Sequence, residues 1–125
     1  MLNYLLIAAG GALGAMARYA TSVIINNMFP FAMVPWGTVT VNTVGSFLLS
    51  YLMFSLVHVL KLPSEFVMFF GTGFLGAFTT FSTFMYEFFS LLEESYIRGL
   101  MYITVTILFG FGAVYLGYIL SKLGA

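Results

Sequence analysis

Four long apolar segments limit what this 125-residue chain can fold into. They cover about 2–25, 35–60, 65–92 and 96–120, and turn-forming or charged residues separate them. Each segment exceeds the roughly 20 residues that a helix needs to cross the hydrocarbon core of a bilayer. The sequence therefore predicts an all-α membrane protein in which residues 1–125 form a single domain of four transmembrane helices.

Composition excludes several classes of function. The chain is 62% hydrophobic and only 6% charged, and its net charge is zero. It has no basic surface for nucleic acid and no cysteine for a thiolate site. One histidine, His58, and four scattered carboxylates do not make a plausible zinc or iron site. We therefore expect neither a nucleic-acid-binding protein nor an enzyme.

The distribution of basic residues does not favour one orientation in the membrane. With four spans, Lys61 and Lys122 lie on one side and Arg98 lies on the other. This is almost no bias under the positive-inside rule. The pattern is compatible with insertion in both orientations, although so few basic residues also fit the alternative that orientation is not encoded in them.

The third segment contains an unusual polar stretch at Gly71–Phe84. Small and β-branched residues follow one another from Gly76 to Thr80, which makes a poor helix interior. A bilayer tolerates irregular backbone only where protein or a water-filled path covers it. We expect the helix to break here, and the freed carbonyl groups could coordinate a cation.

Aromatic and hydroxyl side chains continue beyond this predicted break. Phe81, Phe84 and Phe88 recur at helical spacing, next to Ser82 and Thr83. Such a stripe commonly packs in a core or contacts lipid. A phenylalanine ring also has a positive edge that can face an anion, and weak binding of this kind suits conduction.

Two other segments carry polar residues at four-residue spacing. Thr38, Asn42 and Ser46 share one face of the second segment. This stripe of donors suits an anion path, or alternatively hydrogen bonds between helices. Tyr102 and Thr106 form a similar pair on the fourth segment, which is weak support when taken alone.

Arg18 is the one charge well inside a predicted span. It shares a helix face with Gly10 and Gly14, whose small size favours close helix contact within or between chains. An ionisable residue at this depth is a candidate functional residue. Alternatively, its long side chain reaches back to the membrane surface.

Three motifs in order resemble the CrcB/Fluc family of small fluoride channels. They are Gly10-Gly11-Ala12-Leu13-Gly14-Ala15-Met16-Ala17-Arg18-Tyr19, Trp36-Gly37-Thr38-Val39-Thr40-Val41-Asn42-Thr43-Val44-Gly45-Ser46-Phe47 and Gly76-Ala77-Phe78-Thr79-Thr80-Phe81-Ser82-Thr83-Phe84. The resemblance extends over nearly the whole chain. Two residues depart from the family pattern: Ala77 stands where many members have glycine, and Gly110 stands where a third hydroxyl of the fourth helix is expected.

The resemblance implies an antiparallel dual-topology homodimer in the cell (inner) membrane, with two fluoride pathways and a broken third helix. Some members of the family work as heteromeric pairs. The backbone carbonyls of Gly76 and Thr79 from both subunits would hold a structural sodium ion, and Arg18 belongs to the first motif. The residues expected along the fluoride pathway are Thr38, Asn42, Phe81, Ser82, Thr83, Phe84, Tyr102 and Thr106.

The function expected from the sequence is passive, fluoride-selective conduction that exports toxic fluoride and confers fluoride resistance. The alternative is a small dual-topology multidrug or guanidinium exporter. Such a transporter needs an acidic residue inside a span for proton exchange. Glu87 is the only acidic residue at all deep, and it lies near the end of the third segment.

Overall fold

The computed structural model describes residues 1–57 and 60–123, and within these ranges every element is helical. His58, in the second predicted span, lies outside the described residues. Short π-helical stretches interrupt two of the spans. In chain order the elements are α1 (Leu2–Met28), α2 (Trp36–Tyr51), the π-helix η1 (Leu52–Val57), α3 (Ser64–Phe66), the π-helix η2 (Val67–Leu75), α4 (Gly76–Phe78), α5 (Ser82–Glu94) and α6 (Tyr96–Leu123).

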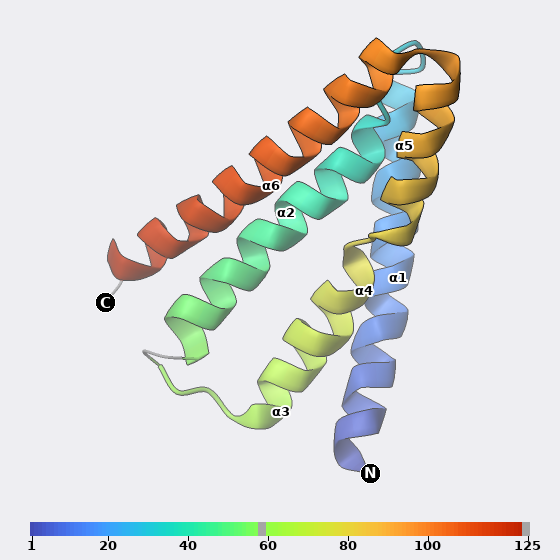
Figure 1. Ribbon diagram of the computed structural model, residues 1–125. Coiled ribbons are helices and arrows are strands. Elements are labelled where there is room, and N and C mark those ends of the chain that lie inside the picture. The colour runs from blue at the N-terminus through green and yellow to red at the C-terminus, as the bar shows by residue number, and fades with distance from the viewer. Residues whose placement is uncertain (58–59, 124–125) are drawn as a thin grey trace.

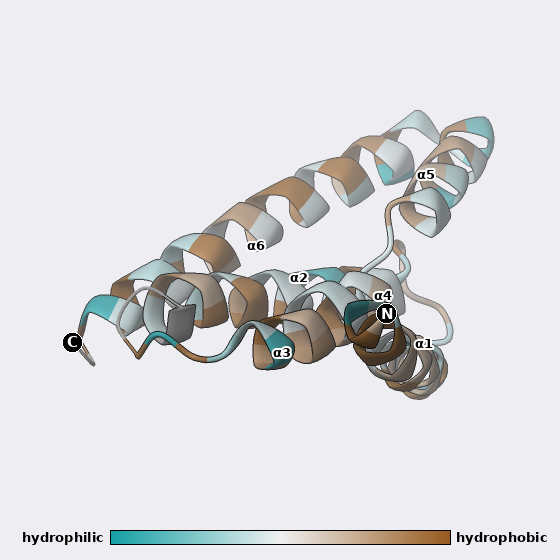
Figure 2. Ribbon diagram, turned by 90° about the horizontal axis from the view of Figure 1, so that it is seen from below, coloured by the Kyte–Doolittle hydropathy of each residue, from teal (hydrophilic) through white to brown (hydrophobic). Residues whose placement is uncertain are grey.

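The helices form an elongated bundle with α1 and α6 on its outside (Figure 1). The α3–η2–α4 segment runs beside α1, and α2 lies between that segment and α6. Seen from below, α1, α4 and α2 form one layer, and α6 leaves this layer obliquely to join α5 (Figure 2). Apolar residues occur along the length of α6, as expected for a helix that faces lipid.

Three helical stretches among the described residues are long and apolar enough to cross a membrane: Trp36–Ser55, Ser64–Glu94 and Tyr96–Leu123. These stretches confirm the prediction of an all-helical membrane protein. The α1 helix has 27 residues and so spans about 40 Å. It is not among these three stretches, and it contains Arg18 and several small or hydroxyl residues. Its membrane crossing stays a prediction.

Glycines place α1 directly against η2. A Cβ atom on Gly10 would overlap the carbonyl oxygen of Phe69, and one on Gly14 would overlap that of Phe74. Backbone therefore packs on backbone, as small residues allow between membrane helices. The glycine face predicted on the first span makes its contact within the chain, and this contact fixes the position of the segment that leads to the break.

Polar bonds hold the connections at one end of the bundle. Asn26 Oδ1 accepts a hydrogen bond from the backbone nitrogen of Gly37 at 2.9 Å, which ties the end of α1 to the start of α2. Arg98 Nε donates to the carbonyl oxygen of Met33 at 3.0 Å, and Arg98 also pairs with Glu94 at 2.9 Å. The loop between α1 and α2 is thus attached to α6.

Candidate functional site

The third span breaks between α4 and α5. Residues Thr79–Phe81 are not helical, and Thr79 has extended backbone angles, with φ −86° and ψ 160°. The break was predicted over Gly76–Thr80, but Gly76 is still helical. Before the break, Gly73 of η2 packs against Ile7 and Gly10 of α1. At the break, side chains from α1 and α2 bind the backbone of Ala77 and Thr80.

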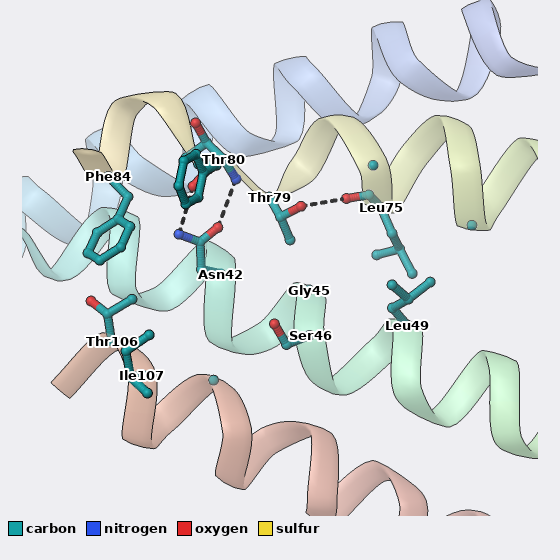
Figure 3. A pocket seen from close by; sticks show the side chains of 14 residues that line it. Asn42, Gly45, Ser46, Leu49, Leu75, Thr79, Thr80, Phe84, Thr106 and Ile107 are labelled. Carbon is teal, nitrogen blue, oxygen red and sulfur yellow. Dashed lines mark hydrogen bonds between the residues drawn. The ribbon is translucent and has the colours of Figure 1, made fainter. Parts of the chain in front are cut away.

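Asn42 braces the break from α2. Its Nδ2 donates to the carbonyl oxygen of Thr80 at 3.0 Å, and its Oδ1 accepts from the backbone nitrogen of Thr80 at 2.8 Å (Figure 3). One side-chain amide therefore satisfies both backbone groups of a residue that has lost its helical partners. The Thr80 hydroxyl in turn accepts from the backbone nitrogen of Thr83 at 3.4 Å, at the start of α5.

Arg18 holds the other side of the break. Its Nε donates to the carbonyl oxygen of Ala77 at 3.1 Å, and the side chain is half-buried. The bond lies at the C-terminal end of α4, where unsatisfied carbonyls favour a cation. Arg18 therefore binds the backbone at the end of α4.

A cavity of about 380 Å³ lies beside the break, between α2 and α6. It brings together residues that the sequence placed on three separate segments. Figure 3 shows how several of them face the space. The lining residues are Asn42, Gly45, Ser46, Leu49, Gly71, Leu75, Gly76, Thr79, Thr80, Phe81, Phe84, Thr106, Ile107 and Gly110.

One residue that lines the cavity has an unsatisfied hydroxyl. Thr106 Oγ1 is buried and has no hydrogen-bond partner among the described residues. A buried polar atom without a partner requires an explanation, such as a water molecule or an ion. Two aromatic rings, those of Phe81 and Phe84, line the same cavity. Phe84 meets Phe81 at 70° and Tyr102 at 79°, with ring centroids 6.4 and 5.1 Å apart.

A second polar cluster lies one helical turn from this cavity. Thr38 Oγ1 donates to Glu87 Oε1 at 2.6 Å, and the Tyr102 hydroxyl donates to the same oxygen at 2.9 Å. Thr38 and Tyr102 are buried, and Glu87 is half-buried. The predicted pathway residues on α2 and α6 are therefore divided between two sites, with Asn42 and Thr106 in the cavity and Thr38 and Tyr102 on Glu87.

The remaining predicted residues differ in their exposure and in their contact with the cavity. Phe81 lines the cavity but is 73% exposed, whereas Phe84 is 5% exposed. Ser82 is exposed at the start of α5, and neither it nor Thr83 lines the cavity.

Two residues important to this geometry were missed as site residues. Thr80 carried a usable signal, because a hydroxyl residue just before a helix commonly caps it. Glu87 was considered only for the exporter alternative, since sequence spacing does not place its partner Thr38 beside it.

The comparisons with known proteins agree with the three motifs. A family model described as CrcB-like protein, Camphor Resistance (CrcB), matches residues 5–118. The chain belongs to the CrcB family. Among its relatives, a protein of Thermotoga petrophila is 54% identical over 121 residues, which cover 97% of this chain and 95% of the relative. A protein of Pyrococcus abyssi is 44% identical over 119 residues, 94% of each chain. Both relatives carry the name Fluoride-specific ion channel FluC.

Family membership covers every residue of the candidate site. The match extends from before Arg18 to beyond Gly110, so the break, its two braces and the cavity all belong to the part shared with the family. The departures noted in the sequence also have places in the structure. The carbonyl oxygen of Ala77 binds Arg18, and Gly110 lines the cavity next to open space.

Proposed function

We propose that this chain forms a passive fluoride channel of the cell (inner) membrane that lets cells export fluoride. One observation carries the proposal: Thr106, which lines the cavity at the helix break, has a buried hydroxyl that no described group satisfies. The name of the relatives identifies fluoride as the ion. The cavity is lined by residues with amide, hydroxyl and aromatic groups that suit this ion. Transport by such a path requires no chemical conversion.

The lining matches the needs of a small, hard anion. Fluoride has to exchange its hydration shell for many weak donors, and conduction requires that none holds it too firmly. Thr106 has a hydroxyl without a described partner, and the rings of Phe81 and Phe84 line the cavity, where a ring edge would offer positive electrostatic potential without a formal charge. Asn42 uses one amide hydrogen on Thr80, which leaves the second hydrogen of Nδ2 for an ion. Larger chloride would be excluded by size and by the spacing of these donors.

The proposal includes an antiparallel homodimer. Phe81 is 73% exposed although it borders the cavity, so a single chain leaves one side of this site uncovered. A second copy inserted in the opposite orientation would close it, and the near absence of charge bias between the two sides permits that insertion. Each chain would then contribute to two pathways.

A structural sodium ion fits the break, where Gly76 and Thr79 would supply backbone carbonyls from both subunits. The backbone nitrogen of Thr80 donates to Asn42, and not to the Gly76 carbonyl four residues earlier. Backbone carbonyls freed in this way are the ligands that broken membrane helices give to sodium. When bound, the ion would supply positive charge that holds the two breaks together.

The exporter alternative has little support in this geometry. Proton exchange would need a carboxylate in the substrate site, but Glu87 binds Thr38 and Tyr102 and does not line the cavity. The names of the relatives also describe a channel.

The proposal is tested with purified protein in liposomes loaded with potassium fluoride. Valinomycin releases potassium, and a fluoride electrode records efflux. We expect efflux well above that of protein-free liposomes, and a much slower rate for Thr106→Val, which removes the free hydroxyl. The control is Thr104→Val, because Thr104 is exposed on another face of α6. No fluoride efflux from folded wild-type protein would overturn the proposal.

A further inference from the structure

One end of the bundle carries an exposed apolar loop beside charged residues. The loop between α1 and α2 reads Phe29-Pro30-Phe31-Ala32-Met33-Val34-Pro35 and contains no polar side chain. Phe29 is 52% exposed and Phe31 is 97% exposed. Arg98 binds this loop and Glu94, so the loop meets the turn between α5 and α6 (Figure 1). Exposed apolar surface of this kind marks contact with a partner or a membrane.

The loop lies at the level where two spans enter the membrane. Two of the stretches that are apolar enough to cross it, Trp36–Ser55 and Tyr96–Leu123, both begin at this end. Tyr96 is 76% exposed, and tyrosine is enriched where a protein meets the headgroups of a bilayer. The apolar loop therefore faces the outer part of the acyl layer, and the charged residues lie among the headgroups.

A small pocket with two unused donors lies under the loop. Its volume is about 230 Å³. Asn26 uses Oδ1 on the backbone nitrogen of Gly37, and its Nδ2 has no partner among the described residues. Arg98 uses Nε and Nη1, and its Nη2 likewise has no described partner. An arginine and an amide donor together suit the oxygens of a phosphate group. The lining residues are Asn26, Phe29, Pro30, Ala32, Val34, Pro35, Leu91 and Arg98.

The acidic residues beside Arg98 indicate which phosphate fits. Glu94 accepts from Arg98 through Oε2 at 2.9 Å, its side chain is 64% exposed, and its Oε1 has no described partner. With Glu93 next to it, two carboxylates face one guanidinium at this turn. A headgroup with a net negative charge would be repelled by this surplus, whereas an ammonium group beside the phosphate would pair with Glu94.

We propose that this pocket binds the headgroup of a zwitterionic phospholipid with a primary ammonium, such as phosphatidylethanolamine. Arg98 Nη2 and Asn26 Nδ2 donate to the phosphate, and Glu94 accepts from the ammonium. Phe29 and Phe31 lie against the upper acyl chains. The inference concerns a lipid site outside the proposed fluoride pathway, and it does not depend on which ion the chain conducts.

The single tryptophan of the chain reports on this site, because Trp36 directly follows Pro35 of the pocket. The protein is reconstituted in phosphatidylcholine with increasing fractions of brominated phosphatidylethanolamine or brominated phosphatidylglycerol, and quenching of Trp36 gives the binding constant of each lipid relative to phosphatidylcholine. We expect the constant for phosphatidylethanolamine to be about three times that for phosphatidylglycerol, the modest ratio that exposed ion pairs give. Equal constants in wild type would overturn the proposal.

Variants of the turn separate the two headgroup contacts. Glu94→Gln should make the two constants equal, because it removes the partner of the ammonium and leaves the bond between Arg98 and Met33 in place. Glu93→Gln removes the same charge from the neighbouring exposed position and should keep the wild-type ratio. An unchanged ratio in Glu94→Gln, or an equal loss in Glu93→Gln, would refute the assigned contact.

Two further measurements test the phosphate contact. Arg98→Gln should lower the constant for phosphatidylethanolamine to about that of phosphatidylcholine, and a wild-type value would remove Arg98 from the site. Excess inorganic phosphate should leave the wild-type ratio unchanged. Loss of the ratio on its addition would show that the pocket takes free phosphate and would overturn the assignment to lipid. Fluoride efflux is not part of these measurements, so their failure leaves the proposed function untouched.

Discussion

Replacement of Asn42 by alanine tests how the break is held. The substitution removes two hydrogen bonds, of 2.8 and 3.0 Å, to the backbone of Thr80. A buried backbone group left without a partner costs about 1–3 kcal/mol, whereas hydrogen bonds between membrane helices average about 0.6 kcal/mol where other partners are available. Because the cavity adjoins Thr80 and can admit water, we expect the smaller cost for each bond, and about 1–2 kcal/mol in total.

Hydrogen exchange measures this loss at the affected residue. The backbone amide of Thr80 should exchange roughly ten times faster in Asn42→Ala than in wild type, since about 1.4 kcal/mol corresponds to a factor of ten. Amides in the middle of α1 should be unchanged. Fluoride efflux should fall more in Asn42→Ala than in Thr38→Ala, because only Asn42 both braces the break and lines the cavity.

Unchanged exchange at Thr80 in Asn42→Ala would refute the bracing role. Equal and negligible effects of Asn42→Ala and Thr38→Ala on efflux would show instead that both residues only join helices.

Three further predictions concern the ring edges, the glycine contact and the arginine. Phe81→Ile and Phe84→Ile should each abolish fluoride efflux while the dimer still forms, since isoleucine has no ring edge; retained efflux in both would remove these rings from the mechanism. Gly14→Ala should lower thermal stability by about 1–3 kcal/mol through overpacking, whereas Gly112→Ala, with open space around it, should not; equal melting of the two would contradict the backbone contact. Arg18→Gln should lower the free energy of unfolding by about 1 kcal/mol, because a neutral donor replaces a charged one at the carbonyl oxygen of Ala77. An unchanged melting temperature would show that this bond contributes nothing to stability.

The helical spans were readable from the sequence because hydropathy and segment length are local properties. Their ends were predicted less well: the first helix continues to Met28, beyond the predicted end near Ile25. The turn-forming residues after Ile25 include Asn26, but its side chain binds Gly37 from within the helix. The π-helical geometry of η1 and η2 was not predicted, because no residue pattern distinguishes a π-helix from an α-helix.

The site was predictable as a set of residues but not as a set of contacts. Asn42 and Thr106, each on a stripe of four-residue spacing, line one cavity. Spacing could not show that the Asn42 amide binds the backbone of Thr80, because the two residues are 38 positions apart. The same limit applies to Glu87, whose bond to Thr38 joins residues 49 positions apart. Long-range pairing depends on how the helices pack, which spacing within one helix does not encode.

Fluoride and chloride efflux from liposomes that contain the wild-type protein, measured side by side after addition of valinomycin, tests the central claim most directly. The account predicts rapid fluoride efflux and no chloride efflux above that of protein-free liposomes. Equal efflux of the two anions would contradict a pathway in which size and donor spacing select fluoride. No efflux of either anion from folded, dimeric protein would contradict the channel itself.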